Sequence, residues 1–389
     1  MKSPFSKVRL FALIGSLLIG LPVVLGVLLS FRGEGESQPQ ARSLDVQWPD
    51  ALENLSSTVV DMAVDDGGVL WFPLLESGAD YTQKNTLYRY DTANGSLQTF
   101  PLPSDPGGTF LARIEAGRGA RAGKVIVGWE STLLEVDRTT GAVSRIPLPL
   151  ELSKFDFGPG TPIVTRMMDV AVGGDGTVWL SRDYYPYLIA ISGDGSYREF
   201  ALPAGSGNPS RLAVDGEGRI WAALSHHQVT DGATAGNLTM RFHPDQEQMD
   251  VLPWQSGSIA GQGGKVVAIG GRGPATVRRL DVVGAAPQPL SEFGPAFPHD
   301  EVAVGPDGAV WYRSPVVNGL VRLAADGASN VFSLPTLTGN LADTGCRPHP
   351  TKGSCQGTFT TGTSIFGIAA APDGSAWFST GDSIGHAVP

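Results

Sequence analysis

The stretch EVAVGPDGAVWYR, residues 301–313, carries the pattern that decides the fold of this chain. An alternating apolar run leads into an Asp-Gly turn and then into a short strand centred on tryptophan, which is typical of a β-hairpin. The same pattern recurs in four other places, as VDMAVDDGGVLWF, MDVAVGGDGTVWLS, RLAVDGEGRIWAA and FGIAAAPDGSAWFS. The chain is therefore built from repeats.

The spacing of these repeats gives their number. The tryptophans of the five clear copies are Trp71, Trp179, Trp221, Trp311 and Trp377. Their successive spacings are 108, 42, 90 and 66 residues. Two of these spacings are about twice the usual unit of roughly 40–50 residues, so each should hide one further unit. Weaker copies do occur there, as KVIVGW at 124–129 and KVVAIGG at 265–271, which gives seven units.

Each unit has the strand and turn signals of a four-stranded antiparallel sheet, which could not bury both of its faces alone. Radial repetition lets each sheet cover its neighbours. We therefore predict an all-β, seven-bladed β-propeller over residues 43–389. The last unit ends at SIGHAVP without a fourth strand, and SLDVQWP at 43–49 resembles the fourth strands of other units. We expect residues 43–49 to complete the seventh blade and close the ring.

Composition supports this fold and excludes one class of partner. The 389 residues include 51 glycines and 29 prolines, which suits many tight turns better than long helices. Residues 43–389 carry 23 basic and 36 acidic side chains, a net charge of −13. A surface of that sign repels phosphate backbones, so no nucleic-acid partner is expected.

The N-terminal segment predicts attachment to a membrane. Lys2, Lys7 and Arg9 precede an uncharged apolar run over residues 10–31, which is long enough to cross a bilayer as a helix. The positive-inside rule then places the N-terminus in the cytoplasm and the propeller outside the membrane. We predict a cytoplasmic stub and transmembrane signal-anchor over 1–31 and a flexible tether over 32–42. A cleaved signal peptide, leaving a secreted or periplasmic propeller, remains the alternative.

Candidate ligand-binding residues lie in the longer loops, which the propeller topology places together around one end of the central channel, the channel mouth. Loops that vary on a regular scaffold commonly carry binding residues, and tyrosine and arginine are favoured at recognition surfaces. The candidates are Arg182, Asp183, Tyr184, Tyr185, Tyr187, His226, His227, Asp300, Glu301 and Arg313. Packing of the aromatic rings on a neighbouring blade, and solvation of the histidines, remain the alternatives.

Two further features belong to the same face. His299 stands at the start of an innermost strand and is the candidate catalytic base, with a capped strand entry as the alternative reading. Cys346 and Cys355 lie in the long segment GCRPHPTKGSC, in an oxidising compartment if the topology is right. We predict a disulfide between them, worth roughly 2.5–3 kcal/mol in the chain-entropy model.

Repeats such as VAVGPDGAVWY and IAISGDGSYREFALP resemble those of the streptogramin B lyase (virginiamycin B lyase) family and, more loosely, NHL-repeat and gluconolactonase-like propellers. The resemblance covers residues 43–389 and implies the seven-bladed fold. It also implies lyase chemistry in which histidine and glutamate side chains act with Mg2+ in the channel.

The chain departs from that family just after its tryptophans. Many family repeats carry a Thr-Glu pair there, whereas this chain reads WFPL, WLSR, WAAL, WYRS and WFST. No metal site and no cofactor are therefore expected. The main hypothesis is a membrane-tethered extracytoplasmic propeller that binds an unknown small molecule or protein at the channel mouth. The alternative is a lyase or lactone hydrolase that uses a channel-mouth histidine and Mg2+.

Overall fold

The structure is a computed structural model that describes most of residues 42–389. Within this range the description leaves out residues 54, 56–58, 78–82, 104–111, 130–131, 149–154, 157–161, 164–166, 184, 226–237, 253, 255, 271–275, 283–287, 290–300, 315–318, 335, 341–357, 363–364 and 381–382. The described part contains no helix with the length and apolar character needed to span a membrane. The predicted anchor and the tether up to residue 41 lie outside the described residues.

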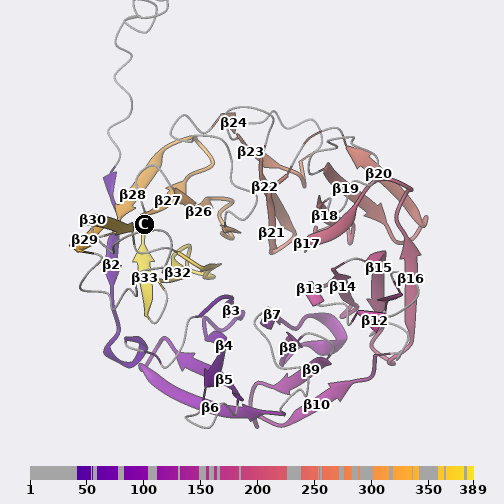
Figure 1. The fold of residues 1–389 in the computed structure, drawn as a ribbon, viewed down its shortest axis with the longest axis horizontal. Helices are drawn as coiled ribbons and strands as arrows, with labels where there is room; N and C mark the ends of the chain where they lie inside the picture. Colours follow the sequence, from indigo (N-terminus) through magenta and orange to yellow (C-terminus); the bar gives the residue numbers. More distant parts are fainter. Residues whose placement is uncertain are drawn as a thin grey trace, which may run out of the picture. The chain divides into compact units, whose positions relative to one another are not determined.

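The described strands form seven antiparallel sheets of a β-propeller, arranged around a central axis (Figure 1). Blade 1 contains β3 (Ala63–Val64), β4 (Leu70–Ser77), β5 (Gln83–Asp91) and β6 (Ser96–Leu102). Blade 2 contains β7 (Ala112–Ala116), β8 (Lys124–Trp129), β9 (Thr132–Asp137) and β10 (Val143–Ile146). Blade 3 contains β13 (Met167–Val172), β14 (Val178–Arg182), β15 (Tyr185–Ile191) and β16 (Tyr197–Ala201). The predicted seven-bladed, all-β fold is confirmed.

The remaining blades continue in the same order. Blade 4 contains β17 (Asn208–Val214), β18 (Ile220–Ser225), β19 (Leu238–His243) and β20 (Gln248–Leu252). Blade 5 contains β21 (Ser258–Gln262), β22 (Lys265–Gly270), β23 (Thr276–Arg279) and β24 (Gln288–Pro289). Blade 6 contains β25 (Val302–Val304), β26 (Val310–Ser314), β27 (Gly319–Leu323) and β28 (Ser329–Ser333). Blade 7 contains β31 (Gly367–Ala370), β32 (Ala376–Ser379) and β33 (Ile384–Val388).

The two ends of the described range meet in blade 7, as the sequence predicts. Strand β2 (Asp45–Gln47) pairs antiparallel with β33 and supplies the fourth strand. Just before it, β1 (Arg42–Ser43) pairs parallel with β28, the outer strand of blade 6. The propeller therefore begins at Arg42, one residue before the predicted boundary at residue 43. Leu44, between β1 and β2, is buried with residues of both blades. The N-terminal strand therefore joins blade 6 to blade 7.

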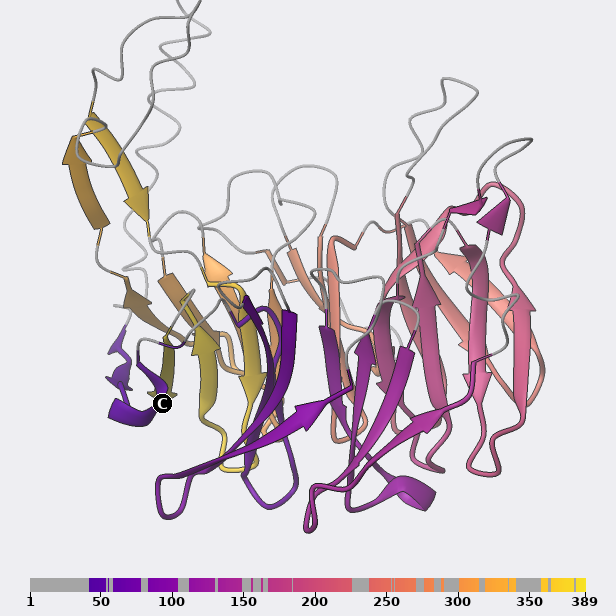
Figure 2. The ribbon, with the colours of Figure 1, turned by 60° about the horizontal axis from the view of Figure 1, so that its bottom comes forward.

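Additional short elements lie outside the blades. Two 3-10 turns, η1 (Asp50–Leu52) and η2 (Gly119–Arg121), connect strands. Two hairpins, β11 (Phe155–Asp156) with β12 (Pro162–Ile163) and β29 (Thr336–Asn340) with β30 (Thr358–Gly362), leave the blades on one face. Figure 2 shows these hairpins at the top and the short turns that end the inner strands at the bottom. The top face is the channel mouth, and the bottom is called the Asp-Gly face.

The tryptophan of each clear repeat packs between blades. Its strand partner on the inner strand is an alanine in all five cases, as in the pairs Ala213 with Trp221 and Ala303 with Trp311. The small alanine leaves space for the indole, which is buried against the next blade. Trp179 of blade 3, for example, meets Phe242 of blade 4 edge-on at 5.7 Å between ring centroids. These layers of apolar side chains between blades form the core of the propeller.

The Asp-Gly turns hold the tryptophans in two of the blades. In blade 4, Asp215 accepts hydrogen bonds from the backbone N–H groups of Glu217 and Arg219 and from the indole N–H of Trp221 at 2.8 Å. In blade 1, Asp65 makes the same set of bonds, including one from the indole of its own blade's tryptophan at 3.0 Å. The turn also needs glycine, since Gly218 has a φ of 76°.

Candidate functional site in the central channel

The central channel forms a candidate site among the described residues. The inner strands of all seven blades line a cavity of about 790 Å³ that extends from the mouth to the Asp-Gly face. Nine carboxylate side chains and two arginines line it, together with apolar side chains and glycine backbone. A pocket with several polar groups that converge on an open space is the usual form of a ligand site.

One position of the repeat supplies most of the charge at the mouth end. In the five blades with a tryptophan repeat, this position lies two residues before the alanine that pairs with the tryptophan. In blades 2 and 5 it lies two residues before the residue that takes the place of that alanine. We call the seven residues at this position the channel ring. From blade 1 to blade 7 they are Asp61, Arg113, Asp169, Arg211, Ser258, Glu301 and Gly367. Five of the seven are therefore ionisable, and they alternate in sign over blades 1 to 4.

Hydrogen bonds to neighbouring blades hold the carboxylates of this ring in place. Asp61 accepts a bond from the backbone N–H of Ile114 in blade 2 at 3.1 Å. Asp169 accepts one from the backbone N–H of Leu212 in blade 4 at 2.7 Å. Each aspartate thus bridges from its own blade to the next one. Carboxylates fixed by backbone donors are preorganised, because they need no rearrangement when a ligand arrives.

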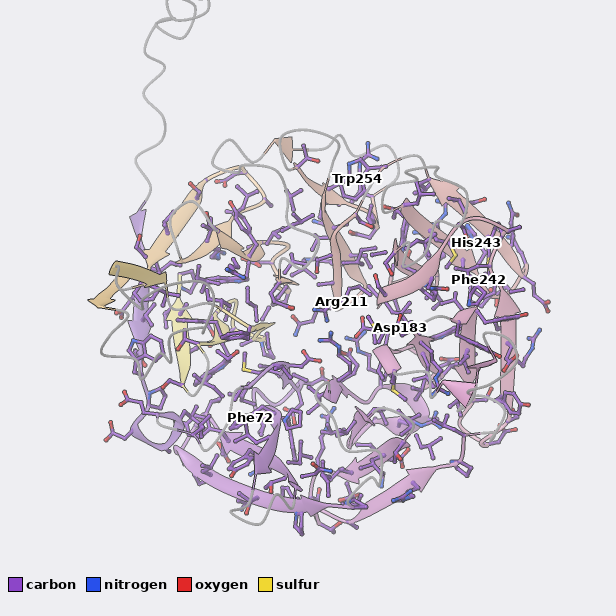
Figure 3. All side chains as sticks on the ribbon, in the orientation of Figure 1. Phe72, Asp183, Arg211, Phe242, His243 and Trp254 are labelled. Carbon is purple, nitrogen blue, oxygen red and sulfur yellow. The ribbon has the colours of Figure 1, made fainter. Side chains whose placement is uncertain are left out.

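The two arginines of the ring have different surroundings. Arg113 donates through Nε to the backbone carbonyl of Met168 in blade 3 at 2.8 Å, and its Nη1 lies 3.9 Å from Asp61 Oδ2. Arg211 instead extends toward the centre of the channel, as Figure 3 shows. Its Nη2 forms an ion pair with Glu301 Oε1 at 2.5 Å. Because these residues belong to blades 4 and 6, the pair passes in front of the buried Ser258 of blade 5.

Two carboxyl groups at this end of the channel titrate closer to neutral pH than ordinary carboxyls do. Burial raises the pKa of Asp61 from 3.8 to about 6; Arg113 opposes this shift, and Asp169 and Glu301 add to it. Burial likewise raises the pKa of Glu115 from 4.5 to about 7, although Arg118 lies 3.3 Å away. Glu115 occupies the alanine position of blade 2 and lines the same cavity. Carboxyls with such pKa values can give up or accept a proton at physiological pH.

The charge on Arg211 is strongly favoured. Burial works against the guanidinium ion, but Glu301, Asp169 and Asp61 outweigh it, so the pKa of Arg211 is raised above its ordinary value. Three carboxylates from three other blades therefore share one cation. The arrangement can bind charged groups of a ligand and can exchange protons with it.

The structure places the residues predicted from the sequence in several environments. Glu301 lines the cavity, and its backbone carbonyl accepts a bond from the N–H of Arg313, a half-buried residue of β26, at 3.2 Å. Arg182 ends β14 and is buried, with 1% of its surface exposed, and burial lowers its pKa to about 10. Asp183 follows it in the turn. The remaining candidates Tyr184, His226, His227, His299 and Asp300 lie outside the described residues, as do Cys346 and Cys355.

The tyrosines of this segment belong to a strand instead of an open loop. Tyr185 and Tyr187 are the first and third residues of β15, and their rings lie 4.7 Å apart. The hydroxyl of Tyr185 donates to Glu199 on the adjacent strand at 3.1 Å. Strand pairing between Arg182 and Tyr185 leaves only two residues for the turn. These contacts lie within blade 3, and the assignment of the two tyrosines to a ligand site stays a prediction.

The positions after the tryptophans, where the family resemblance implies glutamates, are also buried. They hold Leu74, Arg182, Leu224, Ser314 and Thr380, all with at most 9% exposure. Among the described residues, no group of three or more His, Cys, Asp or Glu side chains is arranged to hold a metal ion. The ionisable groups at the channel are instead spread over separate blades.

Sequence analysis missed most of the channel ring. Of its ionisable members only Glu301 is among the predicted site residues. A signal was present, because aligning VDMAV, MDVAV, SRLAV and DEVAV places a charged residue two positions before the alanine in each. The propeller geometry brings charges at the same inner-strand position of several blades together around the channel.

Comparisons with known proteins support the fold. No protein-family model matches this chain, and no curated protein matches its sequence. Among solved structures, a streptogramin B lyase matches with a TM-score of 0.60 and 14% identity over 89% of this chain and 97% of its own. A catalytically inactive virginiamycin B lyase from Staphylococcus aureus with quinupristin matches with a TM-score of 0.58 and 15% identity, over 89% and 100%.

A third solved structure, YCF48 bound to D1 peptide, matches with a TM-score of 0.52 and 13% identity over 91% of this chain and 97% of its own. Identities this low show the shared fold alone. At that level the resemblance to streptogramin B lyase propellers, predicted from the repeats, is confirmed.

Proposed function

We propose that this chain is a ligand-binding β-propeller whose site is the mouth end of the central channel. The channel ring is the observation that carries this proposal. Four ionisable side chains of the ring, Asp61, Asp169, Arg211 and Glu301, come from four blades and line one level of an open cavity. Backbone groups of neighbouring blades hold two of the carboxylates in place. Desolvated, fixed charges are costly to a fold unless they act on a ligand or on one another.

The proposal includes the location. The apolar run over residues 10–31 tethers the propeller to the outer side of a membrane, where it meets ligands from outside the cytoplasm. The ligand is a small molecule or a protein segment that enters the mouth. The structures of a lyase with quinupristin and of YCF48 with a peptide support both kinds of ligand by analogy of fold.

Binding at the ring is tested with a matched pair of variants. Arg211→Gln removes the ring arginine that faces the channel, and Arg198→Gln removes an exposed arginine of similar geometry, 2.6 Å from Glu247. Thermal-shift screening uses a panel of amines, carboxylic acids, lactones and short peptides. Compounds that bind at the ring should stabilise wild type and the Arg198→Gln variant equally, and the Arg211→Gln variant to a clearly different extent. A panel in which no compound distinguishes the two variants contradicts the proposal.

The location has its own test. Protease added to intact spheroplasts should digest the propeller of the full-length protein, whereas a cytoplasmic control protein remains intact. Protection of the propeller in intact spheroplasts contradicts an extracytoplasmic position.

One observation favours a second function, acid–base catalysis in the channel. Asp61 and Glu115 both have pKa values near neutrality, beside the cations Arg113 and Arg118. Such a pair could remove and return a proton in an elimination or a lactone hydrolysis. Ring opening of quinupristin, measured with Mg2+ present, tests this. Turnover lost in both Asp61→Asn and Glu115→Gln supports catalysis by these groups, and turnover unchanged in both excludes it.

A further inference from the structure

The channel cavity carries a strong imbalance of charge. Its lining includes nine Asp and Glu side chains, but Arg118 and Arg211 are its only cationic side chains among the described residues. The carboxylates are distributed from the ring at the mouth to residues such as Asp175 and Glu217 at the Asp-Gly face. A cleft lined by one sign of charge and enclosed by apolar walls focuses the field and concentrates ions of the opposite sign.

A cation of the protein itself already occupies the mouth end of this cavity. The guanidinium of Arg211 pairs with Glu301 at 2.5 Å and is also stabilised by Asp169 and Asp61. It reaches these carboxylates across the channel instead of along its own blade wall. Arg211 and Glu301 each retain partial exposure, 17% and 19% of their side-chain surfaces, so the pair remains open to the cavity.

We propose that the channel takes a ligand with an organic cation, such as an alkylammonium or guanidinium group, and that this cation displaces Arg211 from Glu301. This inference rests on the proposed function and names the ligand class of the same site. A planar guanidinium, that of Arg211, is the group that the carboxylates of the ring hold in this structure. A ligand with a similar group can replace it without leaving Glu301 buried and unpaired.

The geometry favours an organic cation over a metal ion. The described carboxylates come from separate blades, and no three of them are arranged to coordinate one ion. A cavity of about 790 Å³ is in the range that accommodates small organic ligands. The distributed charge attracts a cationic group over the length of the channel, and Glu301 gives it a direct partner.

Charge selection by the channel can be measured without knowing the ligand. Ala260 is a half-buried residue of β21 that lines the cavity two residues below Ser258, and Ala260→Cys places a thiol there. The probes are two methanethiosulfonates of similar size, one ending in trimethylammonium and one in sulfonate. Ser144→Cys, on the exposed outer strand of blade 2, is the reference thiol. Peptide mass analysis separates these sites from Cys346 and Cys355.

The cationic reagent should be preferred at position 260. We expect the ratio of cationic to anionic reaction rates there to exceed the ratio at position 144 by on the order of tenfold at low salt. The excess should shrink as salt is added. Equal ratios at the two positions overturn the inference.

The role of Arg211 is tested in the Ala260→Cys background with two matched ion pairs. Arg211→Gln should raise the cationic preference severalfold, because it removes the resident cation, and Glu301→Gln should lower it. Arg198→Gln and Glu247→Gln remove the partners of an exposed pair with a similar distance, 2.6 Å, and should change nothing. If Arg211→Gln leaves the ratio unchanged in a variant that still melts cooperatively, the proposed displacement of Arg211 is overturned.

The two proposals fail in different ways. If the screen finds compounds that depend on Arg211 but the reagent ratios are equal, the site binds ligands and the cationic class is wrong. If the ratios differ but no compound depends on Arg211, the channel selects cations and its assignment as the ligand site is wrong.

Discussion

The tryptophan layers and the channel ring come from two positions of one repeat. Charged side chains have different roles at these two positions. In the tryptophan layers the same residue recurs in five blades, and charged groups such as Asp215 serve to hold it. In the channel ring the residue changes from blade to blade, between aspartate, arginine, serine, glutamate and glycine. The constant position packs the fold, and the variable position is free to define a site.

The partners of the charges show the same contrast. Asp215 is satisfied within its own blade, by Arg219 at 2.6 Å and by Trp221. The ring carboxylates reach other blades, as in the pair of Arg211 with Glu301. Substitutions in the tryptophan layers should therefore act on stability, whereas those in the ring should act on ligands and on pH dependence.

The largest effect is expected from Asp215→Ala. This change removes the acceptor of two backbone N–H groups and of the Trp221 indole, and it leaves the buried Arg219 with only the exposed Glu217 as an ion-pair partner. Loss of one member of a buried ion pair typically costs about 3–5 kcal/mol. Chemical denaturation should show a loss of that size. The control Asp194→Ala, in an exposed outer turn, should change the denaturation midpoint little. Equal losses of stability in the two variants would contradict the structural role assigned to Asp215.

A second prediction concerns the pH dependence that two channel carboxyls add, Asp61 of the ring and Glu115 near it. The folded pKa values of Asp61 and Glu115 lie above their values of 3.8 and 4.5 in the unfolded chain. Their contribution to stability is therefore full below pH 4 and is lost as the pH rises through about 6 and 7.

The double variant Asp61→Asn/Glu115→Gln should remove this dependence. From pH 5 to pH 8 wild type should lose on the order of 1–3 kcal/mol more than the double variant, after allowance for the partial exposure of both groups. Melting temperatures at a series of pH values provide the measurement. Parallel curves for the two proteins would show that these carboxyls titrate normally.

The sequence predicted the packing of this protein better than its chemistry. Tryptophan, the Asp-Gly turn and the alternating strand lie within about a dozen neighbouring residues, so a local pattern is sufficient to find them. Closure by residues 45–47 followed from counting strands. Each ring residue, by contrast, is one charge at the start of a strand. Whether such a charge belongs to a site depends on the residues of the other six blades, so it is recognised only when the repeats are aligned.

Arg182 shows how the same reasoning misplaced a side chain. The run of Arg182 to Tyr187 has the composition of a recognition loop, and the sequence offered no sign that strand pairing continues to its ends. In the structure Arg182 pairs with Tyr185, and the arginine is buried at the end of its strand. Its lowered pKa, caused by burial, is that of a guanidinium held inside the wall of a blade.

A third prediction compares two tryptophans of the same layer type. Trp221 donates to Asp215, whereas blade 6 has Gly305 at that position and the indole N–H of Trp311 has no acceptor among the described residues. Both indoles are buried, with arginines over their rings at 5.6 Å and 5.8 Å. Trp221→Phe should therefore cost about 1 kcal/mol more than Trp311→Phe, the value of one hydrogen bond. Denaturant titrations of both variants measure the difference, and a larger loss for Trp311→Phe would reverse the assignment.

The smallest effect is expected from His386, the titratable group of the tryptophan layer in blade 7. Its ring stacks on Trp377 at 4.2 Å, and its Nε2 lies 2.8 Å from the hydroxyl of Ser375. That hydroxyl donates to Asp373 at 2.5 Å, so the histidine is the donor to Ser375. Burial lowers the pKa of His386 below its ordinary 6.5, partly offset by Asp373. The neutral ring is therefore the form that the fold prefers.

The sign is thus opposite to that of the channel ring. The contribution of His386 to stability is present above pH 6.5 and is lost as the pH falls through the lowered folded pKa, because the unfolded chain takes up the proton first. The effect is best measured in the Asp61→Asn/Glu115→Gln background, in which these two channel carboxyls no longer add stability in acid. There the melting temperature should fall between pH 7.5 and pH 5. Adding His386→Gln, which keeps a donor for Ser375, should flatten that fall. If the slope is unchanged, acid sensitivity of the tryptophan layer comes from another group.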